Sequence, residues 1–200
     1  MHKQRPQMTA VILAGGMGRR MGGRDKGLVE LKGRPLIAHV IEAIEPQVSH
    51  LLINANRNQP VYARFGPPVL PDELDDFQGP LAGILTAMRK VPTPLLLVVP
   101  CDAPHLPADL GTRLWRAMAD ADTEIAVAHD GNHLQPVHAL ITTALADDLE
   151  SYLGSGKRKI DQWYTQHRMV VVDFSDRPEA FVNINTLDER NELEGNEQNR

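Results

Sequence analysis

The chain has 200 residues, of which 42% are hydrophobic and 24% are charged, and its formal net charge at pH 7 is −5. This length can bury a substantial core in one domain, and the dispersed acidic charge argues against a nucleic-acid-binding protein. One cysteine excludes an internal disulfide, no Cys/His spacing resembles a zinc site, and no apolar run approaches a signal peptide or the ~20 residues of a membrane span. We therefore expect a cytoplasmic protein with a flexible N-terminus (1–8), one domain (9–194) and a flexible tail (195–200).

Short apolar segments that suit strands alternate with segments of helical spacing, which predicts βαβ units and a mainly parallel sheet between two layers of helices. We expect strands at 10–13, 28–31, 50–54, 69–70, 94–100, 124–129, 134–141, 169–174 and 181–184. We expect helices at 35–44, 80–88, 109–119, 143–153 and 160–167, and a capping-box spacing predicts another that begins at 186. The apolar run 94–100 is typical of a central strand, and the Gly131-Asn132 turn indicates a hairpin that makes the far edge antiparallel.

A long polar turn follows the first expected strand, with five glycines, three arginines and a lysine between Leu13 and Lys26. Glycines at this place let backbone N–H groups approach an anion closely, which favours phosphate binding. The turn lacks the P-loop signature because Gly27, not a hydroxyl residue, follows Lys26, and a dinucleotide fold would pass directly into a helix. A surface turn with solvated basic residues is the alternative.

Further polar residues follow the other expected strands, and ligands of open α/β sheets bind at the carboxyl ends of strands. These candidates are the turn from Gly15 to Lys26, Asn54, Asp72, Asp102, Asn183 and Asn185. Asp102 follows the most apolar strand, where an unpaired carboxylate is costly, so it either binds Mg²⁺ opposite the phosphates or caps the turn before Pro104. Asn54 and Asp72 suit ribose or base contacts, or close turns. Gly83, in a first helical turn, indicates a close approach by a ligand or by backbone.

Several motifs resemble known families. Leu13-Ala-Gly-Gly16, Arg20-Met-Gly22 and Asp25-Lys-Gly27 resemble the signature of nucleotidyltransferases with a Rossmann-like fold of the glycosyltransferase-A, or nucleotide-diphospho-sugar transferase, type. The segments 79–83, 100–104, 135–140 and 181–186 are similar to those of molybdenum cofactor guanylyltransferases, and the resemblance runs from about Thr9 to Leu193. It implies an α/β three-layer sandwich and Mg²⁺-dependent transfer of GMP from GTP to the phosphate of molybdopterin, with release of pyrophosphate.

The resemblance also implies roles for particular residues. The residues implied to bind the nucleotide are Leu13, Ala14 and Gly15 at the guanine, Lys26 at the phosphates, Asn54 and Asp72 at the nucleoside, and Asp102 through Mg²⁺. Asp102, Lys26 and Arg19 are implied to be catalytic, because they would neutralise charge that grows on the leaving group. The residues implied to lie around the acceptor are Gly79, Gly83, Asn183 and Asn185. The basic loop of Lys157, Arg158 and Lys159 either holds the pterin phosphate or is solvated.

Other functions stay open at this point. Cytidylyl transfer to the same pterin is one, although such relatives carry Leu-Ala-Ala-Gly where this chain has Leu13-Ala-Gly-Gly16. A sugar-phosphate nucleotidyltransferase is another, although a Gly-Thr-Arg element is absent from the turn. A catalytically silent nucleotide-binding assembly factor is the third, against which the retention of both Lys26 and Asp102 argues. We expect a monomer that contacts cofactor-insertion proteins and molybdoenzyme chaperones transiently, with no nucleic acid or membrane partner.

Overall fold

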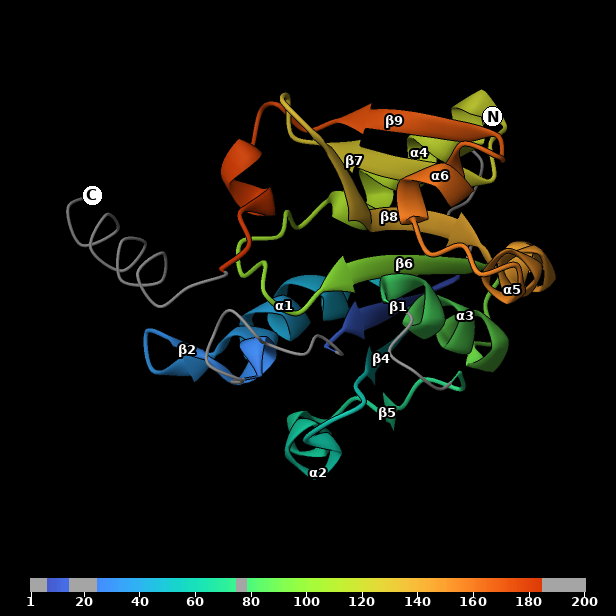
Figure 1. Cartoon of the computed structure of the whole chain (residues 1–200). Coiled ribbons are helices and arrows are strands. Elements are labelled where there is room, and N and C mark those ends of the chain that lie inside the picture. The colour runs from blue at the N-terminus through green and yellow to red at the C-terminus, as the bar shows by residue number, and fades with distance from the viewer. Residues whose placement is uncertain (1–6, 15–24, 75–78, 185–200) are drawn as a thin grey trace.

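The computed structural model describes residues 7–14, 25–74 and 79–184, and within them a seven-stranded sheet forms the centre of the fold (Figure 1). The strand order is β5-β4-β1-β6-β8-β7-β9. These strands are β1 (Met8–Leu13), β4 (His50–Asn54), β5 (Val69–Leu70), β6 (Leu95–Pro100), β7 (Ile125–His129), β8 (Leu134–Thr142) and β9 (Met169–Asp173). A separate two-stranded ribbon pairs β2 (Glu30–Leu31) with β3 (Arg34–Pro35). The α/β class with a mainly parallel sheet is confirmed.

Helices cover both faces of the sheet because its central strands are apolar on both sides. The helices are α1 (Leu36–Ile44), α2 (Gln59–Tyr62), α3 (Pro80–Lys90), α4 (Leu110–Ala121), α5 (Ala146–Gly154) and α6 (Ile160–Tyr164). Leu97 and Val99 of β6 belong to one buried cluster, which includes residues of α1 and α4. Leu96 and Val98 belong to the other, which includes residues of α3, α5 and α6. This alternation produces the three layers.

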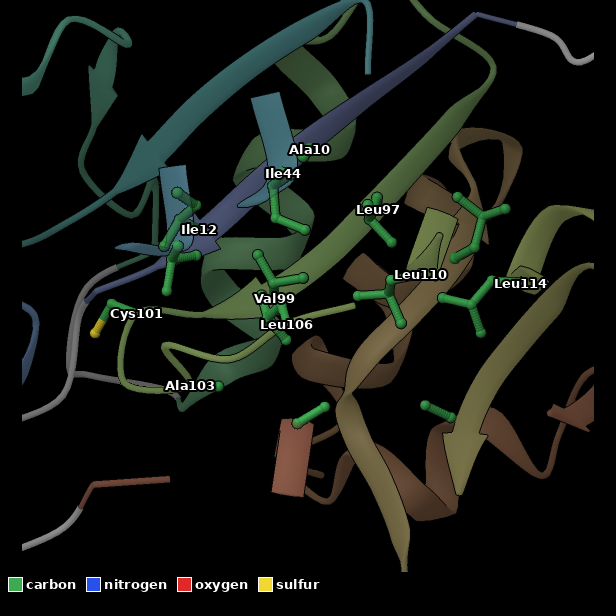
Figure 2. Packing of buried hydrophobic residues seen from close by; sticks show 14 of the residues in the cluster. Ala10, Ile12, Ile44, Leu97, Val99, Cys101, Ala103, Leu106, Leu110 and Leu114 are labelled. Carbon is green, nitrogen blue, oxygen red and sulfur yellow. The ribbon is translucent and has the colours of Figure 1, made fainter. Parts of the chain in front are cut away.

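Residues of the first cluster continue along β6 to the carboxyl end of the strand. Figure 2 shows Leu97 and Val99 beside Leu106 and Leu110, with Cys101 farther along the same row. Each of the four leucine and valine side chains is at most 6% exposed, so this part of the strand is tightly held. A rigid, fully packed β6 fixes the position of the residues that follow it.

Two expectations about strands are wrong. The antiparallel strand is not at the far edge: β8 runs antiparallel between β6 and β7, and the edge strand β9 is parallel to β7. Burial explains this order, because Leu140 of β8 is fully buried whereas Val171 of β9 is 47% exposed. Residues 181–184 do not form a strand, because Phe181 is the last residue of a 3₁₀ turn over Pro178–Phe181 and the Ile184 N–H donates to the Asp102 carbonyl at 3.0 Å.

Smaller differences concern the ends of elements. Lys26–Leu28 is a 3₁₀ turn, so the strand expected at 28–31 shortens to β2. Pro35 precedes α1 with extended backbone instead of forming its first turn. The helix expected to begin at 186 lies outside the described residues. Among the described residues, none of the helices combines the length and apolar character needed to cross a bilayer.

Candidate functional site

A cavity of about 440 Å³ lies where β1, β4 and β6 end. In the parallel register, Leu13 is opposite Asn54 on one side and Pro100 on the other, so three strands end at the same level. The residues that follow these strands must therefore meet at one edge of the sheet, as ligand sites of open α/β sheets do.

Most of the candidate residues border this cavity. Those that do so are Leu13, Ala14, Lys26, Asn54, Asp72, Gly79, Asp102 and Asn183. The lining also contains Asn56, which the sequence did not indicate, and residues of the candidate turn and family segments that were given no individual role, namely Asp25, Pro80, Pro100, Cys101 and Val137. Gly15, Arg19 and Asn185 lie outside the described residues. Gly83 and the basic loop 157–159 are not part of the described lining.

Lys26 and Asp102 form an ion pair in the lining of the cavity. The Lys26 ammonium donates to Asp102 Oδ2 at 3.0 Å, and the Lys26 side chain is 29% exposed whereas Asp102 is buried. The main chain of Asp102 is held as well, because its carbonyl accepts the Ile184 N–H at 3.0 Å. The pair thus joins a cation from the end of the basic turn to a carboxylate after the central strand, and both residues border the cavity.

Asp72 is held by two asparagines that approach it from β4 and the residues after it. Asn54 Nδ2 donates to Asp72 Oδ1 and Asn56 Nδ2 donates to Asp72 Oδ2, each at 2.8 Å. The Asp72 N–H in turn donates to Asn56 Oδ1 at 2.8 Å. These charge-assisted bonds fix the carboxylate in one orientation while each oxygen keeps a further lone pair for a ligand.

Gly83 affects the site through a neighbouring side chain. A Cβ atom at this position would lie 2.2 Å from Asn54 Oδ1 and 3.1 Å from Leu13 Cδ2. The close approach expected at Gly83 therefore comes from the Asn54 amide, packed against the first turns of α3. Gly79, just before α3, has φ of 76°, a conformation that favours glycine, and it borders the cavity together with Pro80.

Cys101 lies in the lining but lacks the character of a nucleophile. Burial raises the pKa of its thiol well above the usual value, and the nearby carboxylates of Asp102 and Asp25 raise it further. The thiol is therefore protonated at neutral pH, and the thiolate is the reactive form. Cys101 therefore behaves as a small buried hydrophobic residue.

The charges of the described lining are three carboxylates and one ammonium, from Asp25, Asp72, Asp102 and Lys26. A polyanionic nucleotide brought to these residues alone would meet net repulsion. Among the described residues, no cluster of three or more His, Cys, Asp or Glu side chains forms a complete protein metal site. This donor set fits Mg²⁺, which takes one or two carboxylates and completes its shell with phosphates and water.

The chain is similar to known proteins over most of its length. The family of the MobA-like NTP transferase domain matches residues 10–170. A molybdenum cofactor guanylyltransferase from Shewanella loihica is 56% identical, over 94% of this chain and 96% of the relative. One from Shewanella baltica is 54% identical over 94% and 95%.

Solved structures share the fold. The molybdopterin-guanine dinucleotide biosynthesis protein A from Archaeoglobus fulgidus has a TM-score of 0.80 and 24% identity, over 97% of this chain and 100% of that one. The 4-diphosphocytidyl-2C-methyl-D-erythritol synthase from Anaerococcus prevotii has a TM-score of 0.77 and 11% identity, over 96% of both chains. These structures support the nucleotidyltransferase architecture that the turn motifs implied.

Proposed function

This chain belongs to the family of molybdenum cofactor guanylyltransferases, and on that premise we propose that it transfers GMP from GTP to the phosphate of molybdopterin, with release of pyrophosphate. The observation that carries the proposal is the convergence of Lys26, Asn54, Asp72 and Asp102 on one cavity at the carboxyl edge of the sheet. In the reaction, an oxygen of the acceptor phosphate bonds to the α-phosphorus of GTP while the bond from that phosphorus to the β-phosphate oxygen breaks. The acceptor is already an anion, so no strong general base is required.

The nucleotide is assigned to the side of the cavity formed by β1, β4 and Asp72. The Ala14 N–H donates to the Asn54 carbonyl at 2.8 Å, and the Leu13 carbonyl accepts the Cys101 N–H at 3.1 Å. We assign the base to the Ala14 carbonyl and the second lone pair of the Leu13 carbonyl, because acceptors at this place match the N1–H and amino donors of guanine. Asn54 and Asp72 would hold the ribose hydroxyls, and Gly15 stays a prediction.

Lys26 and Asp102 are assigned to the phosphates. The Lys26 ammonium would move from its ion pair with Asp102 toward the triphosphate and neutralise charge that grows on pyrophosphate. Asp102 would then hold Mg²⁺, which when bound draws charge from the phosphate oxygens and offsets the three carboxylates of the lining. Arg19 stays a prediction as a further cation.

The acceptor is assigned to the opposite side of the cavity, toward Val137 of β8 and Asn183. Gly79 borders the same space at the start of α3, so it is retained as an acceptor contact. Gly83 is retained only through its support of Asn54, and Asn185 and the basic loop 157–159 remain predictions. Arg158 donates to the Leu153 carbonyl at 2.7 Å, which ties that loop to the end of α5.

The proposal is tested by incubating the protein with molybdopterin and Mg²⁺ together with either GTP or CTP, and measuring dinucleotide and pyrophosphate. Product with GTP is expected. Turnover with CTP alone would replace guanylyl by cytidylyl transfer, and GTP binding without turnover would favour the silent assembly factor. Chelation with EDTA should abolish product, and excess Mg²⁺ should restore it.

A further inference from the structure

Lys26 is flanked by two residues that contact the same buried tyrosine. The Tyr62 hydroxyl donates to Asp25 Oδ1 on one side of Lys26. On the other side, a Cβ atom at Gly27 would lie 2.6 Å from that hydroxyl oxygen, so the glycine backbone packs directly against it. Tyr62 is fully buried and ends α2, which is far from Lys26 in the sequence. One side chain therefore fixes the main chain on both sides of the catalytic lysine.

The Asp25 carboxylate has a second partner from the same region. Asn58 Nδ2 donates to Asp25 Oδ2 at 3.1 Å. Asn58 precedes α2 and holds it as well, because its carbonyl accepts the Tyr62 N–H at 3.0 Å from a left-handed backbone with φ of 52°. Both carboxylate oxygens of Asp25 are thus bonded to a neutral donor of this segment, although Asp25 is only 7% exposed and borders the cavity.

These bonds give Asp25 a different environment from that of Asp102. Tyr62 and Asn58 each donate to one oxygen of Asp25, whereas Asp102 Oδ2 pairs with the Lys26 ammonium. Burial raises the pKa of the Tyr62 hydroxyl, which therefore stays protonated as a donor. Tyr62 and Asn58 hold the Asp25 carboxylate by hydrogen bonds. The ammonium of the neighbouring Lys26 pairs instead with Asp102, at 3.0 Å.

We propose that Tyr62 and Asn58 are positioning residues, which hold Asp25 and Gly27 so that the Lys26 ammonium reaches the nucleotide phosphates. This inference rests on the proposed function, because it uses Lys26 as the phosphate-binding cation. Its consequence is a dependence of the phosphate site on a helix that does not itself border the cavity. The hydroxyl of Tyr62 acts through Lys26, so its removal should have no effect where Lys26 is absent.

A double-mutant cycle on GTP binding tests this dependence. In the presence of Mg²⁺ and without molybdopterin, Tyr62→Phe should raise the Kd of GTP about tenfold, since small displacements of a positioned group are costly. In a Lys26→Ala background the same change should alter Kd less than about twofold. Equal effects in both backgrounds would overturn the proposal, because a general loss of structure does not depend on Lys26. Tyr152→Phe is the control, since it removes a buried hydroxyl that donates to the Lys159 carbonyl outside the cavity.

A second variant covers the case in which Tyr62→Phe fails to fold. Asn58→Gly removes the amide but suits the left-handed backbone, and it should raise the Kd of GTP by a smaller factor that again disappears with Lys26→Ala. An unchanged Kd would contradict the role of Asn58. Turnover assays of the wild type distinguish a failure of the proposed function from a failure of this inference. Absence of GMP transfer refutes the proposed function, whereas normal transfer with independent effects of Tyr62 and Lys26 refutes only the inference.

Discussion

Replacement of Gly83 by alanine tests how α3 supports the nucleotide site. The added methyl would lie 2.2 Å from Asn54 Oδ1 and 2.7 Å from Asn54 Cγ, distances that no unstrained structure keeps. Asn54 must therefore rotate or α3 must move away. Rotation breaks the bonds from Asn54 Nδ2 to Asp72 Oδ1 at 2.8 Å and to the Leu70 carbonyl at 3.2 Å.

The expected magnitude follows from three contributions. Overpacking costs about 1–3 kcal/mol, and the lost bond to a charged group costs about 1.5–3 kcal/mol. Alanine is favoured over glycine within a helix by about 1 kcal/mol, which offsets part of this cost. The free energy of unfolding should therefore fall by about 1.5–5 kcal/mol, and the KM for GTP should rise at least tenfold because Asp72 loses its orientation.

Urea unfolding and steady-state kinetics with varied GTP measure these two effects. Gly154→Ala is the matched control, because an added Cβ at the end of α5 meets no atom within 4 Å. That variant should lose no stability and should keep its KM for both substrates. If Gly83→Ala raised the KM for molybdopterin and left that for GTP unchanged, Gly83 would face the acceptor directly and the reasoning from Asn54 would be refuted.

Three other perturbations examine the Asp102 carboxylate, the recognition of the guanine base and the buried His138. Asp102→Asn should lower kcat about 10²-fold, whereas the same change at the exposed Asp120 of α4 should not, and a near-normal rate would move the metal site elsewhere. Inosine triphosphate, which lacks the amino group of guanine, should show a kcat/KM about tenfold below that of GTP, and equal values would contradict carbonyl readout. Burial lowers the pKa of His138 from 6.5 to about 3. In the unfolded chain the His138 imidazole binds a proton below about pH 6.5, whereas in the folded chain it does so only near pH 3. The free energy of unfolding therefore falls as the pH decreases, by about 2 kcal/mol between pH 7 and pH 5. In urea unfolding at pH 7 and pH 5, His138→Leu should remove this difference, and an unchanged difference would assign the acid sensitivity to other groups.

The elements that periodicity predicts well are those whose packing is decided locally. The strand expected at 50–54 and the helix that begins at Pro80 agree with β4 and α3, because apolar runs and a proline at a first turn act over a few residues. The position of β8 was not predictable in this way. Its insertion between β6 and β7 depends on which strand has two buried faces, and this is a property of the whole sheet.

The candidate site likewise contains residues that local sequence patterns reveal and residues that only the tertiary structure reveals. Asp102, Asn54 and Asp72 could be found because each lies at the end of an apolar strand or two residues after it, and the rule for ligand sites needs only that order. Asn56 lies at the same distance from the end of β4, so the same rule could have included it. Tyr62 carries no comparable signal, because it is a buried aromatic residue whose hydroxyl partner, Asp25, is distant in the sequence. A supporting residue of this kind becomes visible only when the hydrogen bonds between elements are known.

The reversed direction of β8 divides the cavity between two halves of the chain. Residues up to Asp72 supply the described lining on the nucleotide side, whereas Val137 and Asn183 come from the later part, and Gly79, Pro80 and Pro100–Asp102 lie between them in the sequence. The beginning of β8, not its end, reaches this edge, so its side of the lining can change without altering the Asn54, Asn56 and Asp72 bonds. A chimaera that exchanges only the later half with another nucleotidyltransferase would thus keep its specificity for the nucleotide and take the acceptor specificity of the other enzyme. The two halves of the lining would then be exchangeable units that meet at β6.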